Sequence, residues 1–256
     1  MTTVIVLAEP PVEGVACKQL VEQTDLTPND GLALYEALVA DTMATLEQST
    51  VDILVNYPQA DAVPGDSEDI DPKARLRELA AKAMSPDRFE EIRFEPQVGG
   101  NFSAKAGNAI THLIRDEDAQ SATVLDPCVP RLARSIVDEG ALKLRRADVV
   151  LGPAARGDVY FAGFSDLIDF TDVFETQPIE AVTREATAND LAVDFLRTRE
   201  VLSTPADLRG VLTRLTANTL AGKPLPEQFW KTIQEREIEL RDGEITSAAA
   251  EATDSS

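Results

Sequence analysis

The sequence predicts an α/β fold with a mostly parallel sheet that is covered by helices on both faces. Short apolar runs rich in β-branched residues recur along the chain, as expected for strands buried in such a sheet. Segments with helical periodicity separate most of these runs, and this alternation favours parallel pairing. We expect strands at residues 3–8, 51–57, 91–96, 122–126, 147–153, 158–164 and 191–196.

The clearest helix start is the stretch LTPND, with Thr27 as N-cap, Pro28 at the first helical position and Asp30 three residues after the cap. Apolar side chains then recur at helical spacing as far as Leu46, which predicts one buried stripe. Further helices are expected from near Val15, over 73–84, 102–115, 130–139 and 178–188, after Pro205, and over 224–240.

The expected domain organisation is one large domain with a carboxyl-terminal addition. Residues 1–220 carry all of the predicted sheet and form the domain. Residues 221–242 form a helical extension with Phe229, Trp230 and Ile233 on one face. The acidic stretch 243–256 offers little to bury, so we expect it to be a disordered tail.

Composition excludes several classes of partner. The chain has 256 residues and a formal net charge of −21 at pH 7, which repels nucleic acid and anionic membranes. It contains no apolar run of about 18 residues, and its start lacks the basic and long apolar regions of a signal peptide, so we expect a cytoplasmic protein. Only seven of its 24 basic residues are Lys. This acid-rich, Lys-poor balance predicts a halophilic source, because concentrated salt screens the self-repulsion.

Cys17 and Cys128 are the only cysteines, too few for a disulfide framework, and His112 is the only histidine. If both thiols reach one cleft, they suggest a redox or soft-metal site with His112 as a third ligand. Alternatively, the cysteines are small core side chains and His112 is an ordinary packed or surface group.

Four loops follow predicted strands and contain Gly, Pro and small residues, at 9–19, 97–105, 126–131 and 152–158. In parallel α/β sheets ligands bind beyond the carboxyl ends of the strands, so we expect these loops to line the site. PPVEGVACKQL lacks the Gly-Lys-Ser/Thr ending of a phosphate-binding P-loop, and QVGGN is not a dinucleotide fingerprint.

The order of the motifs identifies a resemblance over residues 3–210. LALYEALVADTMATL, QVGGNFSAKAGNAI, VLDPCVPRL, DVVLGPAARGDVYFAGF and STPADL follow one another. In this order they resemble prokaryotic nucleotide-diphospho-sugar-transferase-like proteins of the glycosyltransferase-A fold, some of which are assigned to arsenosugar biosynthesis. The resemblance implies a Rossmann-like single domain and a nucleotide cleft formed by Gly14, Lys18, Gln97, Gly100, Gly152 and Pro153.

The chain departs from the family where chemistry is expected. Cys128 replaces the metal-binding carboxylate, Arg156 an acid, and Asn101 and Lys105 an Asp and an Arg. Ser203 stands where the family has a leading carboxylate. Mg²⁺ and Mn²⁺ require oxygen ligands, which a thiol and a guanidinium cannot supply. The resemblance therefore implies a haloarchaeal-type divergent member with no metal site.

Two hypotheses for the function follow. In the first, the cleft binds a nucleotide, a nucleotide sugar or a protein partner, and metal-dependent catalysis is lost or altered, so no cofactor is expected. In the alternative, the protein is an active glycosyl- or nucleotidyl-transferase with a rearranged site. Arg156, Asp126 and Asp158 are its candidate catalytic residues, and Mg²⁺ or Mn²⁺ is needed only in this case.

The charge balance predicts that salt stabilises the protein. We expect the free energy of unfolding to rise as KCl increases from about 0.1 M to about 2 M, because screening weakens the repulsion among the carboxylates. Urea titrations at several KCl concentrations measure it. A stability that stays flat across this range would contradict the halophilic interpretation.

Overall fold

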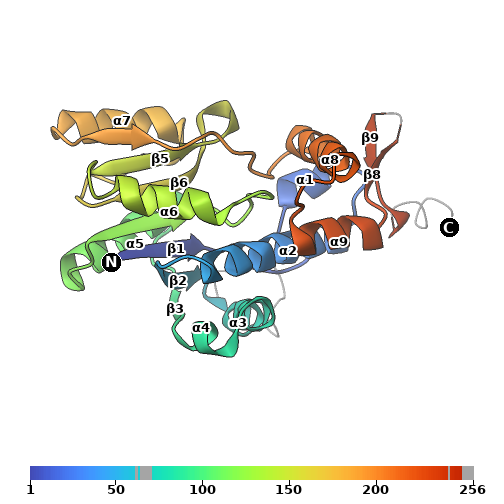
Figure 1. Ribbon diagram of the computed structural model, residues 1–256, viewed down its shortest axis with the longest axis horizontal. Coiled ribbons are helices and arrows are strands. Elements are labelled where there is room, and N and C mark those ends of the chain that lie inside the picture. Colours follow the sequence, from blue (N-terminus) through green and yellow to red (C-terminus); the bar gives the residue numbers. More distant parts are fainter. Residues whose placement is uncertain (61–62, 64–70, 242, 250–256) are drawn as a thin grey trace.

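The computed structural model describes residues 1–60, 63, 71–241 and 243–249, and its main element is a seven-stranded sheet with the order β3-β2-β1-β4-β6-β5-β7 (Figure 1). β1 lies near the middle, and all six of its residues except Thr2 are buried. The strands are β1 (Thr2–Leu7), β2 (Asp52–Tyr57), β3 (Arg93–Pro96), β4 (Ser121–Leu125), β5 (Val149–Pro153), β6 (Val159–Phe164) and β7 (Val193–Phe195).

The sheet is mostly parallel, as predicted. β1 pairs in parallel with β2 and β4, β2 with β3, and β5 with β7. β6 is the exception, because it runs antiparallel to both β4 and β5. A short turn that includes the 3-10 segment η3 (Ala155–Gly157) joins β5 to β6, and a connection this short permits only antiparallel pairing.

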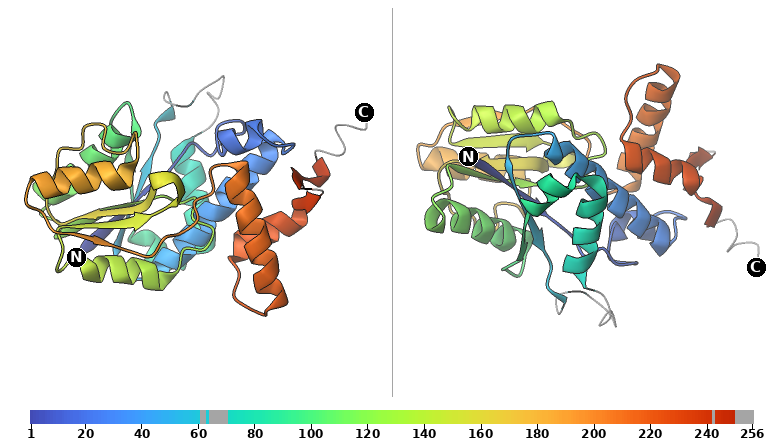
Figure 2. Two further views of the ribbon diagram at one scale, coloured as in Figure 1. Left: turned by 90° about the horizontal axis from the view of Figure 1, so that it is seen from above. Right: turned by 60° about the horizontal axis from the view of Figure 1, so that its bottom comes forward.

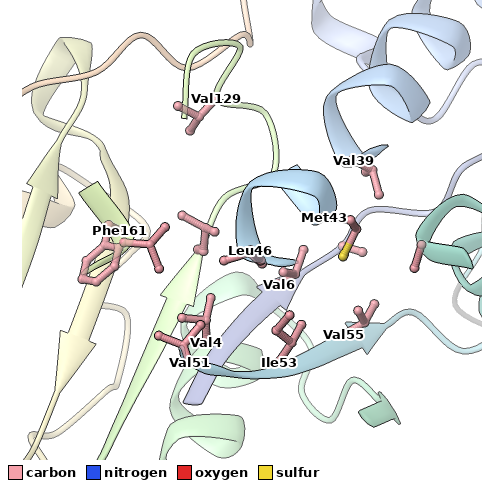
Figure 3. Packing of buried hydrophobic residues seen from close by; sticks show 14 of the residues in the cluster. Val4, Val6, Val39, Met43, Leu46, Val51, Ile53, Val55, Val129 and Phe161 are labelled. Atoms are coloured by element: carbon pink, nitrogen blue, oxygen red, sulfur yellow. The ribbon is translucent and has the colours of Figure 1, made fainter. Parts of the chain in front are cut away.

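Helices cover both faces of the sheet (Figures 1 and 2). α2 (Pro28–Glu47), α3 (Pro72–Ala83) and α6 (Arg134–Lys143) pack on one face, and α5 (Phe102–Thr111) and α7 (Pro178–Ala188) on the other. Alternate strand residues face the two layers, so β1 gives Val4 and Val6 to the first and Ile5 and Leu7 to the second. Figure 3 shows Val6 close to Leu46 and Met43 of α2.

Several shorter elements differ from the expected boundaries. α1 (Lys18–Glu22) begins after the turn that was expected to start a helix near Val15, and α4 (Pro86–Glu90) was not predicted. A π-helical turn, η2 (His112–Asp116), continues α5, and α6 begins four residues later than expected. Among the described residues, no helix is both long and apolar enough to cross a membrane.

α2 begins as the sequence predicted and is buried on two sides. The Thr27 side chain accepts a hydrogen bond from the Asp30 N–H, and the Asp30 carboxylate accepts one from the Thr27 N–H. Tyr35, Met43 and Leu46 pack toward the sheet, whereas Leu34 and Leu38 pack against the carboxyl-terminal helices. The sequence predicted one buried apolar stripe on this helix, but the helix buries a wider surface that faces two partners.

The carboxyl-terminal helices α8 (Pro205–Leu220) and α9 (Glu227–Glu235) lie to one side of the sheet, beyond the end of β1 (Figure 1). α9 is held by α2 near both of its ends. The Asp41 carboxylate accepts hydrogen bonds from the N–H groups of Gln228 and Phe229, which otherwise lack a partner at the helix start. Just after α9, Arg236 forms an ion pair of 2.9 Å with the buried Asp30.

Two expectations for this region were wrong. The helix predicted over 224–240 ends at Glu235, because Glu237 adopts a left-handed conformation with φ of 51° and the N–H of Ile238 turns back to the carbonyl of Ile233. A hairpin of β8 (Glu239–Arg241) and β9 (Glu244–Thr246) follows.

The predicted tail of residues 243–256 does not begin at 243. β9 is ordered, Ile245 is buried, and the Ser247 hydroxyl donates to Asp30 at 2.8 Å. The prediction failed because Asp30, which binds Ser247, is distant in sequence, so no local pattern near residue 247 indicates this contact. Residues 250–256 lie outside the described residues, and the division at residue 220 stays a prediction.

Candidate functional site

A cleft of about 610 Å³ opens at the carboxyl ends of β1 and β4. Three of the four predicted loops line it: the β1–α1 loop, the loop before α5 and the loop after β4. The fourth, 152–158, does not, and residues 201–203 take its place. Because β6 lies between β4 and β5, the loop after β5 starts two strands away from β4.

Two framework side chains fix the end of β1. The amide nitrogen of Gln97 donates to the carbonyls of Ala8 and Asn56, at 2.6 and 2.9 Å, and so ties β1 to β2. From α2, the buried Tyr35 hydroxyl accepts a hydrogen bond of 2.7 Å from the Glu9 N–H. Gln97, which was predicted to line the cleft, therefore does so and also fixes the strand ends from which the cleft opens.

Two lysines reach the cleft from different elements. Lys18 starts α1 and forms an i,i+4 ion pair of 3.7 Å with Glu22. Lys105 lies in the first turns of α5, and its positive charge opposes part of the burial effect that raises the pKa of Glu9. Both residues were singled out from the sequence, and they supply the positive charge of this cleft.

The cleft also contains the acids Glu9 and Asp126, which follow the neighbouring strands β1 and β4. Glu9 is exposed to solvent as a residue, although protein atoms crowd its carboxyl group. This burial and the nearby Asp126 charge raise the pKa of Glu9 to about 7. Burial also raises the pKa of Asp126, against a hydrogen bond of 2.7 Å from the Cys128 N–H.

Glu9 was missed by the sequence analysis. Its carboxylate accepts a hydrogen bond from the Cys17 N–H, so it also holds the following loop in place. The available signal was its position two residues after a buried strand, within one of the loops already expected to line the site.

Cys17 and Cys128 meet in the cleft. Both are half-buried, both line the cleft wall, and their side chains interact directly. This interaction, burial and the Asp126 charge raise the pKa of the Cys128 thiol well above its usual range. His112 is not part of this site, because it lies on the surface and contacts Asp116 and Glu117, each at 3.0 Å.

Arg156 and Asp158 lie beside the cleft and not on its lining. The Arg156 guanidinium donates to the Asp207 carboxylate at 3.0 Å and to the Ser203 hydroxyl at 2.9 Å. Despite burial, hydrogen bonds from Arg156 and Thr204 lower the pKa of Asp207 to about 2. Asp158 is near enough to Asp126 to raise its pKa. The catalytic roles of all three candidates stay predictions.

The other predicted cleft residues lie outside the lining. Gly14 is exposed in the β1–α1 loop with φ of +74°, and Gly100 is exposed before α5. Gly152 is buried, and a Cβ there would lie 2.6 Å from the Tyr160 ring, so this glycine makes room for packing. Pro153 follows it at an irregularity in the β5–β6 register.

The donor set does not suit a hard divalent cation. Among the described residues, no three His, Cys, Asp or Glu side chains are grouped so that they could hold a metal ion. Cys128 offers sulfur, and the carboxylates of Glu9 and Asp126 each accept a backbone N–H. Mg²⁺ and Mn²⁺ prefer sites built from several oxygen ligands, which these residues do not form.

Residues 67–179 match the sequence profile of a family described as "Uncharacterized protein conserved in bacteria (DUF2064)". This stretch includes three of the motifs that carry the resemblance noted above. No curated protein matches the chain.

Three solved structures align with most of the chain. A Desulfovibrio desulfuricans G20 protein, provisionally assigned as a nucleotide-diphospho-sugar transferase, aligns with a TM-score of 0.71 and 19% identity, covering 92% of this chain and 95% of that one. A 4-diphosphocytidyl-2C-methyl-D-erythritol synthase from Anaerococcus prevotii DSM 20548 aligns with a TM-score of 0.48 and 12% identity, covering 84% and 96%. A cytidylyltransferase from Leptospira borgpetersenii gives 0.46 and 10%, covering 92% and 94%. The first of these establishes the glycosyltransferase-A-like fold.

The loop before α5 has one glycine that the backbone requires and one that it does not. Gly99 has φ of +135°, and a Cβ there would lie 2.8 Å from the backbone of Ala104 and Lys105, whereas a Cβ at Gly100 meets no atom within 4 Å. We expect G99A to lower the free energy of unfolding by at least about 2 kcal/mol and G100A to change it by less than about 0.5 kcal/mol. Urea unfolding of both variants measures the difference, and equal effects would contradict this assignment.

Proposed function

We propose that the cleft binds a nucleoside diphosphate or a nucleotide sugar, and that cation-dependent sugar transfer is lost or altered in this protein. The observation that carries the proposal is the convergence of Lys18 and Lys105, from α1 and α5, on one cleft beyond the carboxyl ends of β1 and β4. We expect this binding to take place in the cytoplasm.

The lysines suit a diphosphate. Lys18 is exposed, and its ion pair with Glu22 is a surface contact of 3.7 Å that contributes little and is readily exchanged for a phosphate. Lys105 has no carboxylate within salt-bridge distance among the residues that the structure describes. Two ammonium groups balance the two negative charges of a nucleotide sugar, and most of the charge of a nucleoside diphosphate, without a metal cation.

The carboxylates suit the uncharged part of the ligand. Glu9 and Asp126 lie at the ends of adjacent strands and accept hydrogen bonds, as sugar hydroxyls and base N–H groups require. They also repel phosphate, which places the diphosphate on the lysine side of the cleft. The exposed Phe102, at the start of α5, adds an apolar surface on which a base can stack.

The fold supports this proposal without deciding it, because proteins of one fold carry out different functions. The residue types at the site favour binding without a hard cation, since Cys128 occupies the position at which the related family has a carboxylate. In the same hypothesis, the ligand that occupies the cleft can instead be a protein partner.

One observation favours the alternative of an active transferase. A carboxyl group with a pKa of about 7, as at Glu9, is suited to accept a proton near neutral pH. In such a reaction Glu9 takes the proton of an acceptor hydroxyl, the hydroxyl oxygen bonds to the sugar carbon, and the bond to the diphosphate breaks. Lys18 and Lys105 then meet the charge of the departing diphosphate.

The lysine variants test the binding proposal. We expect calorimetry in about 2 M KCl, with UDP, GDP, CDP, ADP and UDP-glucose, to detect binding of at least one ligand. K105Q should weaken that binding roughly tenfold, through loss of a charge-assisted contact, and K18Q should weaken it similarly. K223Q, at an exposed lysine between α8 and α9, is the matched control.

Added Mn²⁺ separates the two hypotheses in the same experiment. Affinity that is independent of Mn²⁺ supports binding by the lysines. Absence of binding with every nucleotide would overturn the proposal, as would a K18Q/K105Q double variant with wild-type affinity.

Glu9 makes binding dependent on pH. Because its pKa is about 7, its carboxyl group gains a negative charge between pH 6 and pH 8, and the affinity for an anionic ligand should fall as pH rises. E9Q removes this charge, so at pH 8 it should bind roughly fivefold more tightly than the wild type, with a smaller pH dependence. The ligand phosphate also titrates in this range, but it does so equally with the wild type and with E9Q, so the difference between the two pH profiles reports on Glu9. Identical pH profiles would contradict an electrostatic effect of the Glu9 charge on the bound diphosphate.

A further inference from the structure

Cys17 and Cys128, the two cysteines of the chain, lie far apart in the sequence but meet in the cleft. Cys17 ends the β1–α1 loop, and Cys128 is in the loop after β4, the strand that pairs with β1. The parallel pairing of the two strands therefore brings together the two loops that carry the thiols.

The backbone holds both residues in place. Cys17 adopts a left-handed conformation with φ of 53°, its N–H is bound by the Glu9 carboxylate, and its carbonyl accepts a hydrogen bond of 3.1 Å from Val21. Cys128 donates its N–H to Asp126 and accepts a hydrogen bond of 2.8 Å from the Leu202 N–H. Neither thiol is sealed in the core, because both are half-buried and both line the cleft.

We propose that Cys17 and Cys128 form a modification site, in which a small-molecule disulfide entering the cleft converts the two thiols into a reversible intramolecular disulfide. Both side chains open into the same cleft and pack against the same two hydrophobic clusters. Neither role assigned to the lysines and acids of the cleft uses these thiols, so the inference goes beyond the proposed function and does not depend on it.

The exchange proceeds in two steps. The Cys17 thiolate attacks one sulfur of the small disulfide RSSR, a Cys17–S–S–R bond forms, the RSSR bond breaks, and RS⁻ leaves. That thiolate takes the proton of the Cys128 thiol and departs as RSH. Cys128 then attacks the Cys17 sulfur, and the second RS⁻ leaves and takes up a proton from water. The protein loses two electrons and two protons, and RSSR becomes two RSH.

Cys17 is the attacking group in this scheme, because Cys128 is held as the neutral thiol. Contact with Cys17 and burial disfavour the Cys128 thiolate, and the charges of Asp126 and Glu9 oppose it as well. The same carboxylates slow the attack of Cys128 on the mixed disulfide. Formation of the intramolecular disulfide should therefore be slower than exchange between free thiols, but it should go to completion.

Oxidised glutathione and hydroxyethyl disulfide test the proposal on the full chain in about 2 M KCl. We expect reactive thiols, counted after unfolding and alkylation, to fall from two per chain to none. The intact mass should fall by two hydrogens, and a peptide pair containing Cys17 and Cys128 should be linked. Dithiothreitol should restore both thiols. C17S and C128S should instead keep a mixed-disulfide adduct or remain unmodified.

The folded state itself is tested by repeating the oxidation in guanidinium. If the fold brings the thiols together, the intramolecular disulfide should form at a roughly tenfold lower ratio of oxidised to reduced glutathione in the native protein than in the unfolded chain. Two thiols that persist in the native protein would overturn the proposal, as would a stable adduct on one cysteine of the wild type or a disulfide between chains.

Discussion

The position of the β1 carboxyl end is the constraint on which the cleft depends. Gln97 fixes it from the β3–α5 loop and Tyr35 from α2, through hydrogen bonds to backbone atoms of Ala8 and Glu9. With Glu9 placed in this way, its carboxylate holds the N–H of Cys17, and α1 follows directly. Glu9 and the loop that follows it, with Cys17 and Lys18, therefore extend from a strand end that two polar side chains hold, one from α2 and one from the loop after β3.

The cleft combines charges that would be unfavourable in isolation. Burial raises the pKa of both Glu9 and Asp126, the charge of Asp126 raises the pKa of Glu9 further, and the charge of Lys105 offsets part of the effect on Glu9. An arrangement of this kind discriminates between parts of a ligand, because phosphate is favoured at one side and hydroxyl groups at the other. That the cleft works without Mg²⁺ or Mn²⁺, on a fold of the glycosyltransferase-A type, stays a prediction.

Local signals predicted most of the fold. The capping residues Thr27 and Asp30 placed the start of α2 correctly, and α7 matches its predicted range, because both rest on interactions between near neighbours in sequence. The antiparallel direction of β6 and the hairpin after α9 were missed, since each depends on how a segment meets distant partners.

The site was predicted less completely than the fold. Lys18, Gln97 and Asp126 line the cleft as expected, whereas the loop at 152–158 is drawn instead to the start of α8 by Arg156 and Asp207. Glu9 was not predicted as a site residue, because the sequence does not show how closely protein atoms surround a carboxylate in a loop. Gly99 and Gly100 are adjacent and look alike in sequence, and only the backbone conformation separates their roles.

The polar cluster around Asp30 bears on how the chain folds during synthesis. Asp30 is fully buried, yet its partners Arg236 and Ser247 are made 206 and 217 residues later. Until the ribosome has released them, α2 and the sheet can form, but a buried carboxylate lacks much of its compensation. Nascent chains should therefore hold an incomplete core until Arg236 and Ser247 have left the ribosome, and the packing of this segment onto α2 completes the folded state.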